Sequence, residues 1–153
     1  MFEATSVCKA TVDIAALPDR IFAFMTDPKN LKSWQPDVVE ARPLPPGGLQ
    51  VGAHVGATVE EYGRTFDVHL QVAAMERNEH IAYRVEAPTV SAVVEYRLVQ
   101  WGSQTLVVST TAMRPKGFLG SMYPVLKGLI KSMVRRKMQS RLNLLRAAVE
   151  SHA

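Results

Sequence analysis

The sequence predicts an α+β fold in which one long C-terminal helix covers an antiparallel β-sheet. Three observations lead to this prediction: period-2 alternation near the N-terminus, β-branched runs separated by turn signals from Val38 onward, and a helical apolar stripe over 118–149. The 153 residues suit one domain and contain neither a repeat nor a low-complexity segment. We therefore expect a single domain over residues 1–153.

The N-terminal part predicts one strand and two short helices. Polar and apolar residues alternate over 8–14, which indicates a strand that buries Cys8, Ala10, Val12 and Ile14. Pro18 and Asp19 favour a helix start, and the helix that follows has an apolar stripe of Ile21, Phe24 and Met25. Pro28 breaks this helix, and a second short helix is predicted over 29–34.

From Val38 onward, the sequence predicts six strands that follow one another as an antiparallel meander. A long connection is expected over 42–48, and the later turn signals are Tyr62-Gly63, Arg77-Asn78, Ala87-Pro88 and Trp101-Gly102. Alternation gives the sheet one apolar face and one wet face. The side chains expected on the apolar face are Phe66, Val68, Leu70, Val72, Ile81, Tyr83, Val85, Val90, Ala92, Val94, Tyr96, Leu98, Leu106, Val108, Thr110 and Ala112.

For the strand over 54–62, the sequence pattern does not decide which side chains face inward. The inward side chains are either Val55, Ala57, Val59 and Glu61, or Gly56, Thr58, Glu60 and Tyr62. One glutamate faces inward in either case, and we expect it at the solvent end of the hairpin because buried glutamates are rare.

The C-terminal segment predicts the longest helix of the chain, over 118–149. Its first apolar stripe, expected to cover the sheet, consists of Leu119, Met122, Leu126, Leu129, Ile130 and Met133. A second stripe on a rotated face consists of Met138, Leu142, Leu145 and Val149, which predicts a bend or a change of packing partner near Arg135. One helix covers only part of such a sheet, so a gap between them is expected where the sheet side chains are small.

Composition and charge narrow the function classes. Cys8 is the only cysteine, no segment has the roughly 18 uninterrupted apolar residues of a membrane span, and the N-terminus lacks signal-peptide features, so we expect a cytoplasmic protein. Residues 1–95 carry eight Lys/Arg and thirteen Asp/Glu, net −5, whereas residues 96–149 carry ten Lys/Arg and no acid, net +10. The basic third is either a solvated face or a surface for an anionic partner.

The order of elements and several short motifs resemble the START-like (SRPBCC) superfamily, in its polyketide cyclase/dehydrase and lipid transport branch. The resemblance covers nearly the whole chain, and its most specific residues are Pro18, Ile21, Phe22, Asp27, Pro28, Leu31, Trp34 and Pro36. It implies a helix-grip fold, in which a curved sheet wraps around the long C-terminal helix and encloses a cavity. Members bind lipids, sterols, quinones or hormones, or cyclise polyketides, so the function depends on the particular pocket.

The leading functional prediction is the binding or transport of a hydrophobic small molecule, such as a lipid, a quinone or a polyketide-like compound, between the sheet and the C-terminal helix. Trp34 is either a packing plug or a ligand contact, and both roles are compatible. The residues expected to contact the ligand are Phe24, Trp34, Phe66, Tyr83, Tyr96, Thr110, Met122, Leu126 and Met133.

Catalysis is the principal alternative, as a cofactor-free aromatic polyketide cyclase or dehydratase. The sequence has no G-x-S-x-G elbow, P-loop or G-x-G-x-x-G motif, and His54, His69, His80 and His152 lack metal-ligand spacing. We therefore assign no catalytic residue, no metal and no cofactor. A cyclase would find its polar groups in Arg114 and Tyr123, near the start of the long helix.

A further alternative is an interaction surface on the basic helix. Lys127, Lys131 and Arg135 are spaced as one helical stripe, and Arg136, Lys137 and Arg141 lie nearby in the sequence. An anionic membrane surface or an acidic partner is the expected contact. Nucleic acid is not expected, since no aromatic residues are interleaved with these cations. The stripe over 138–149 or an edge strand also leaves a homodimer open.

Overall fold

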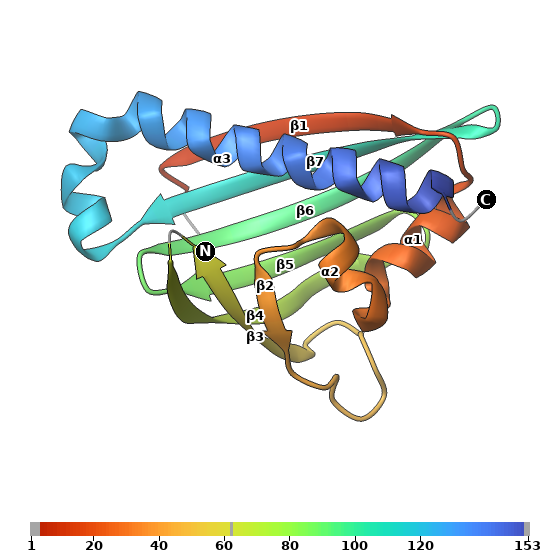
Figure 1. The fold of residues 1–153 in the computed structure, drawn as a ribbon, viewed down its shortest axis with the longest axis horizontal. Coiled ribbons are helices and arrows are strands. Elements are labelled where there is room, and N and C mark those ends of the chain that lie inside the picture. Colours follow the sequence, from red (N-terminus) through yellow and green to blue (C-terminus); the bar gives the residue numbers. More distant parts are fainter. Residues whose placement is uncertain (1–3, 62, 152–153) are drawn as a thin grey trace.

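The computed structural model describes residues 4–61 and 63–151, which form one antiparallel sheet and a set of helices on one of its faces (Figure 1). The elements are β1 (Ser6–Ile14), α1 (Pro18–Thr26), η1 (Pro28–Asn30), α2 (Leu31–Trp34), β2 (Val38–Ala41), β3 (His54–Glu61), β4 (Arg64–Glu76), β5 (His80–Ala87), β6 (Val90–Trp101), β7 (Gln104–Pro115) and α3 (Gly117–Ser151).

The sheet has seven strands in the order β1-β7-β6-β5-β4-β3-β2, and all the neighbouring strands are antiparallel. The six strands from β2 to β7 form the predicted meander, and β1 closes onto β7. Figure 1 shows α3 lying along β1 and β7, with α1 near the C-terminal end of α3 and α2 between α3 and β2. The predicted helix-grip architecture is confirmed.

The connections follow the predicted turn chemistry. Asn78 has a φ of 67° and Gly102 a φ of 63°, and both are in short turns between long strands. Asparagine and glycine are the residues that best tolerate this left-handed conformation. The connection between β2 and β3 covers 42–53 and is longer than the expected 42–48. Tyr62, in another turn signal, lies outside the described residues.

The inward face of β7 is the opposite of the predicted one. The buried residues of this strand are Thr105, Val107, Ser109, Thr111, Met113 and Pro115. Thr110 is paired with Lys9 of β1 and Glu95 of β6, on the outer face of the sheet. Small polar and apolar residues occur at both parities of this strand, so alternation could not decide its face. The register against the clearly alternating β1 decides it instead.

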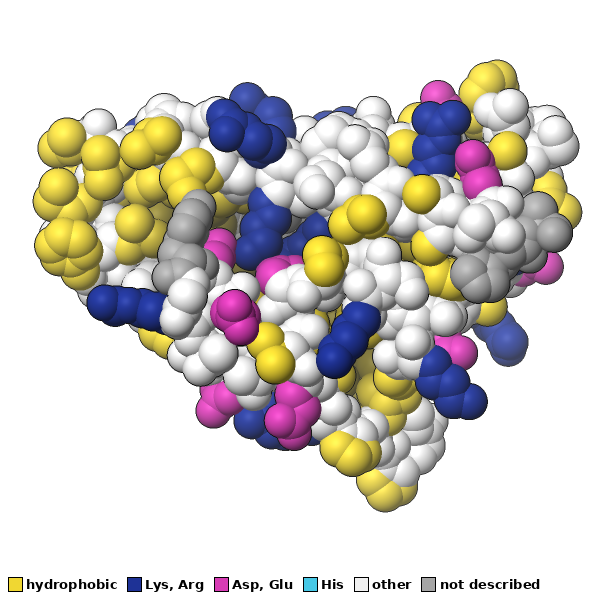
Figure 2. Space-filling model, in the orientation of Figure 1, with side chains coloured by type: hydrophobic (Ala, Val, Ile, Leu, Met, Phe, Trp, Pro, Cys, Tyr) yellow, Lys and Arg dark blue, Asp and Glu magenta, His cyan; other side chains and the backbone are white. Residues whose placement is uncertain are grey.

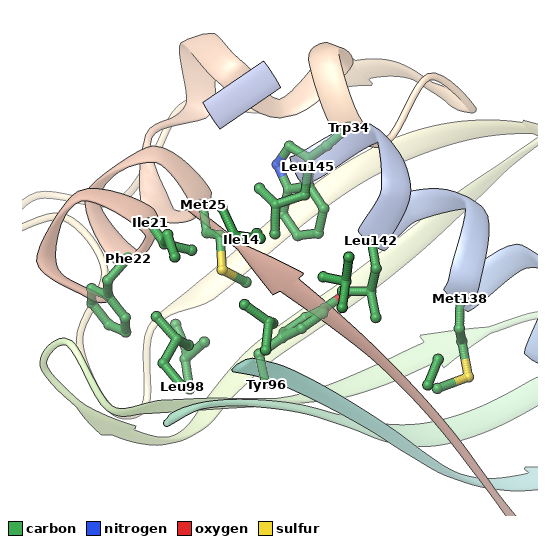
Figure 3. Packing of buried hydrophobic residues seen from close by; sticks show 14 of the residues in the cluster. Ile14, Ile21, Phe22, Met25, Trp34, Tyr96, Leu98, Met138, Leu142 and Leu145 are labelled. Atoms are coloured by element: carbon green, nitrogen blue, oxygen red, sulfur yellow. The ribbon is translucent and has the colours of Figure 1, made fainter. Parts of the chain in front are cut away.

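The core lies between the inner sheet face, α1, α2 and the second half of α3 (Figure 3). The predicted strand set from Cys8 to Ile14 is buried, and so is the second helical stripe, Met138, Leu142, Leu145 and Val149. In α1 the prediction was partly wrong: Ile21, Phe22 and Met25 are buried, whereas Phe24 is half-buried. Phe22 and Ile21 are adjacent, so α1 presents a wider apolar face than the predicted stripe.

The first half of α3 packs on the sheet through Tyr123, Ile130 and Val134, so only Ile130 of the predicted stripe packs against the core cluster. Met122 and Leu126 are half-buried, while Leu129 is 59% exposed and Met133 is 38% exposed. Figure 1 shows α3 turning sharply in its first turns, where Pro124 lies inside the helix. Proline removes a helical hydrogen bond and kinks a helix. No helix in residues 4–61 and 63–151 is long and apolar enough to cross a membrane.

Candidate functional site

A cavity of about 300 Å³ lies between the sheet and the helices. Its walls come from the end of α1, from η1 and α2, from the inner faces of β2 to β6, and from the middle of α3. Figure 2 shows a hollow below α3, with Lys, Arg, Asp and Glu side chains gathered inside it. The cavity therefore combines apolar walls with a charged group.

Strand alternation supplies most of the apolar wall. The register places Ala57 opposite Val68 and Val59 opposite Phe66, and all four side chains line the cavity. Val55 lines it as well, so β3 presents the first of its two possible faces. Aliphatic side chains and alanine leave the space unfilled where α3 does not reach the outer strands.

Two aromatic residues pack against each other in the wall. The rings of Trp34 and Tyr96 have an edge-to-face contact, with centroids 5.6 Å apart and an interplanar angle of 74°. Trp34 is 2% exposed and belongs to the core cluster as well as to the cavity wall. Trp34 thus packs as a plug and is also placed to contact a ligand.

Two tyrosines of the wall keep their hydroxyl groups protonated at neutral pH. Burial raises the pKa of Tyr83, and the neighbouring Tyr96 raises it further. Burial is also the main cause of the raised pKa of Tyr96, whose side chain hydrogen-bonds with that of Ser109. A protonated hydroxyl both donates and accepts a hydrogen bond, so Tyr83 offers a neutral polar contact in an otherwise apolar wall.

Four charged side chains form an ion-pair cluster at the cavity. Asp37 Oδ2 lies 2.7 Å from Arg141 Nη2 and 3.1 Å from Lys137 Nζ, and Lys137 Nζ also lies 3.0 Å from Glu61 Oε1. Burial acts to raise the pKa of Asp37, but the Arg141 guanidinium and the Lys137 ammonium outweigh it and lower that pKa. Two acids and two bases leave the cluster without net charge.

Two N–H groups of the cavity wall lack an acceptor within the described part of the chain. They are Trp34 Nε1 and Arg141 Nε, and both nitrogens are inaccessible to solvent. A buried donor without a partner costs about 1–3 kcal/mol, so native structures usually satisfy such groups. Both donors belong to residues that line the cavity.

The structure brings together four of the residues expected to contact a ligand and leaves five outside the cavity wall. Trp34, Phe66, Tyr83 and Tyr96 line the cavity. Thr110 lies on the outer sheet face, and Phe24 is half-buried against the core without reaching the cavity lining. Met122, Leu126 and Met133 belong to the part of α3 that extends away from the cavity.

The cluster of Asp37, Glu61, Lys137 and Arg141 was not predicted as part of a site. Lys137 and Arg141 are one helical turn apart, which places both on one side of α3. Their acidic partners come from the residue before β2 and from the end of β3, far away in the sequence. One sequence feature pointed to the cluster: of the two inward faces that alternation allowed for β3, one includes Glu61.

The groups considered for a cyclase lie elsewhere. Neither Tyr123 nor Arg114 lines the cavity, and the Tyr123 hydroxyl hydrogen-bonds with that of Ser6. Among the residues that the structure describes, no three His, Cys, Asp or Glu side chains come together as metal ligands. His152 lies outside these residues.

The fold and the sequence match known proteins. Residues 7–150 match the family described as polyketide cyclase / dehydrase and lipid transport. One solved structure of the same fold is a START superfamily protein from Mycobacterium smegmatis. Its TM-score against this chain is 0.79 at 17% identity, and the match covers 96% of this chain and 99% of that one. No curated protein matches the sequence.

A second solved structure of the same fold is the Zhui aromatase/cyclase from Streptomyces sp. R1128. Its TM-score is 0.73 at 19% identity, and the match covers 95% of this chain and 93% of that one. At such identities, the structural likeness shows a shared fold and leaves the activity open.

Proposed function

Because this chain belongs to the polyketide cyclase/dehydrase and lipid transport family of the START-like (SRPBCC) superfamily, we propose that it binds or transports a hydrophobic small molecule in the cavity below α3. The observation that carries the proposal is a cavity of about 300 Å³ whose wall is mainly aliphatic and aromatic. Ligand pockets of proteins have this character, with a few polar groups that fix the orientation of the ligand.

The energetics suit a lipid-like or quinone-like ligand. Burial of about 300 Å² of apolar ligand surface at roughly 25 cal/mol per Å² contributes about 7 kcal/mol before the costs of association and ordering. Tight binding therefore requires polar contacts in addition to apolar burial. The protonated Tyr83 hydroxyl in the cavity wall favours a ligand that carries an oxygen acceptor.

The charge balance favours a neutral oxygen over a carboxylate. The Asp37 and Glu61 carboxylates already occupy the two cations of the cluster. A ligand carboxylate would lie close to these two acids and compete with them for Lys137 and Arg141. A carbonyl oxygen accepts from the Tyr83 hydroxyl without that repulsion, so the proposed ligands are hydrophobic carbonyl compounds such as quinones, esters or polyketides.

Native mass spectrometry of the purified full chain tests the proposal. The expected result is an adduct that organic extraction identifies as an apolar carbonyl compound. A panel of quinones, esters, polyketides and fatty acids then follows, with the melting temperature as readout, since a ligand of the folded state raises it. If the protein is empty and no panel member raises its melting temperature, the proposal fails.

Polyketide cyclisation is the alternative function of the same cavity. A mainly apolar cavity can hold a reactive chain in a folded conformation, and the Tyr83 hydroxyl is a protonated group in its wall. The test is incubation of the protein with an unreduced polyketide chain, followed by product analysis. An aromatic product whose formation is abolished by Tyr83→Phe supports the cyclase, whereas unchanged substrate decides for binding alone.

A further inference from the structure

The part of the sheet beside the cavity has a small apolar cluster of its own. Val38, Ala57 and Val59 are buried together, and the partly buried residues packed against them come from α2 and β4. Among the residues that the structure describes, α3 contributes apolar side chains to the main core cluster and none to this second cluster. Members of both clusters line the cavity. The cavity therefore interrupts the apolar packing between α3 and the pair β2 and β3.

Charged side chains connect α3 to this part of the sheet. The ion-pair cluster joins Asp37, just before β2, and Glu61, at the end of β3, to Lys137 and Arg141 of α3. All four residues line the cavity, and their side chains are between 16% and 37% exposed. Figure 2 shows Lys, Arg, Asp and Glu side chains in the hollow below α3. The cluster thus stands between the cavity and the solvent.

The neighbouring sides of the cavity are closed by apolar packing or by backbone hydrogen bonds. Trp34 of α2 belongs to the same core cluster as Leu145 of α3, and Leu49, from the connection over 42–53, packs against that cluster. The strands that form the floor are joined by an antiparallel ladder. Opening any of these sides exposes apolar surface or breaks the ladder. Separating partly exposed ion pairs costs less, because water replaces each lost partner.

We propose that the ligand enters and leaves the cavity between α3 and the strand ends at Asp37 and Glu61, and that the ion-pair cluster is the latch that keeps this entrance closed. The proposal rests on the ligand-binding function proposed above and adds the route. When the entrance opens, water takes the place of Lys137 and Arg141 beside the two carboxylates, while the apolar wall keeps its shape. The latch sets the rate of exchange, and the wall sets the affinity.

Trp34 reports on the entrance without any ligand. Its side chain lines the cavity and is 2% exposed. Trp101, the other tryptophan of the chain, is 56% exposed and is removed by Trp101→Phe, so that Trp34 alone fluoresces. Acrylamide, a small neutral quencher, reaches Trp34 when the entrance opens. Its neutrality keeps the quencher itself insensitive to the charges of the cluster.

The latch variant is Asp37→Asn, which removes the carboxylate that Lys137 and Arg141 share. Two controls are made in the same Trp101→Phe protein. Asp67→Asn removes an exposed ion pair outside the cavity wall. Val107→Ala removes buried methyl groups from the core, also outside that wall, and so lowers stability without touching the latch.

We expect the quenching constant of Trp34 to rise about fivefold in Asp37→Asn, since the cluster lies between the exposed and the buried limits for ion pairs. It should also rise in the parent protein at about 1 M salt, where the screening length is about 3 Å. Both controls should leave it unchanged. An unchanged constant in Asp37→Asn, or an equal rise in Val107→Ala, overturns the latch.

Stopped-flow fluorescence with Nile red, a neutral apolar dye with a carbonyl group, tests the route. The rates of association and dissociation should rise by the same factor in Asp37→Asn while Kd stays constant, because a latch changes the barrier and not the bound state. A change confined to dissociation means that Asp37 holds the ligand, and this overturns the latch. If the dye does not bind while quenching of Trp34 responds as expected, the result supports the latch and counts against the proposed function.

Discussion

Replacement of Asp37 by asparagine tests whether the ion-pair cluster holds the cavity end of α3 in place. Asp37 lies just before β2, whereas its partners Lys137 and Arg141 are on α3. The variant keeps the side-chain shape and removes the negative charge that both cations share. Lys137 retains Glu61, at 3.0 Å, while Arg141 loses its ion-pair partner within the described residues.

The size of the effect follows from burial. Removal of one partner from a fully buried ion pair costs about 3–5 kcal/mol, and exposed pairs contribute about 0–1 kcal/mol. The side chain of Asp37 is 16% exposed, that of Arg141 26% and that of Lys137 36%, so water screens this cluster in part. We expect Asp37→Asn to lower the free energy of unfolding by about 1–3 kcal/mol at neutral pH.

The effect of Asp37→Asn also has a defined pH dependence. The pKa of Asp37 is lowered in the folded state from its ordinary 3.8. The stabilising charge is therefore fully present above the unfolded-state pKa and is lost as the pH falls through the lower folded-state pKa. The difference between wild type and variant should stay constant from neutral pH down to about pH 4 and shrink below it.

Urea unfolding at several pH values measures this difference, with Asp67→Asn as the matched control. Asp67 forms a 3.1 Å ion pair with Arg42, but its side chain is 75% exposed, so this replacement should leave the unfolding midpoint nearly unchanged. The reasoning is refuted if the two variants lose the same stability at neutral pH, or if the loss in Asp37→Asn persists undiminished in acid.

Three further predictions concern the cavity wall. Trp34→Ala should lower the free energy of unfolding by about 3–5 kcal/mol, because a buried aromatic side chain is removed from the core; chemical denaturation measures this, and a loss below about 1 kcal/mol contradicts the packing role. Ala57→Leu should fill part of the cavity and abolish the rise in melting temperature caused by a bound ligand, whereas Ala147→Leu on the exposed side of α3 should not. Tyr83 and Tyr96 should remain protonated in the folded protein above pH about 10, where unfolded tyrosine ionises, so stability falls as the pH rises beyond that value. Absorbance titration of the folded wild type and of the Tyr83→Phe variant checks this. The prediction is contradicted if the variant lacks a tyrosine that ionises near pH 10 in the folded wild type.

Strands with unequal faces could be predicted from the sequence, and strands with similar faces could not. In β1 the apolar Cys8 and Ile14 alternate with charged neighbours, and the predicted face is the buried one. In β7, threonine, serine and valine occur at both parities, and Thr110 was assigned to the wrong face. Alternation predicts the buried face of a strand only when the residues at every second position are clearly more apolar than those between them.

The residues predicted to contact a ligand divide in the same way. Trp34, Phe66, Tyr83 and Tyr96 lie in elements whose inward face the local pattern determines, and all four line the cavity. Met133 was predicted from a helical stripe that a straight helix would lay on the sheet. The helix turns near Pro124, and the residues that pack against the core from its first half are Tyr123, Ile130 and Val134.

The sequence by itself determined the fold class and the order of the elements, because these depend on hydrophobic periodicity and on turn residues that act over a few positions. The superfamily followed from the resemblance of short motifs such as Asp27-Pro28 and Trp34. Tertiary structure alone decided the cavity volume, the ion-pair cluster and the exposure of Phe118, Val125 and Leu129. Asp37 and Arg141 are 104 residues apart, and only the approach of α3 to the strand edge brings their charges within 2.7 Å. Local patterns show which residues avoid water, whereas the register of strands and the path of a helix determine which of them meet.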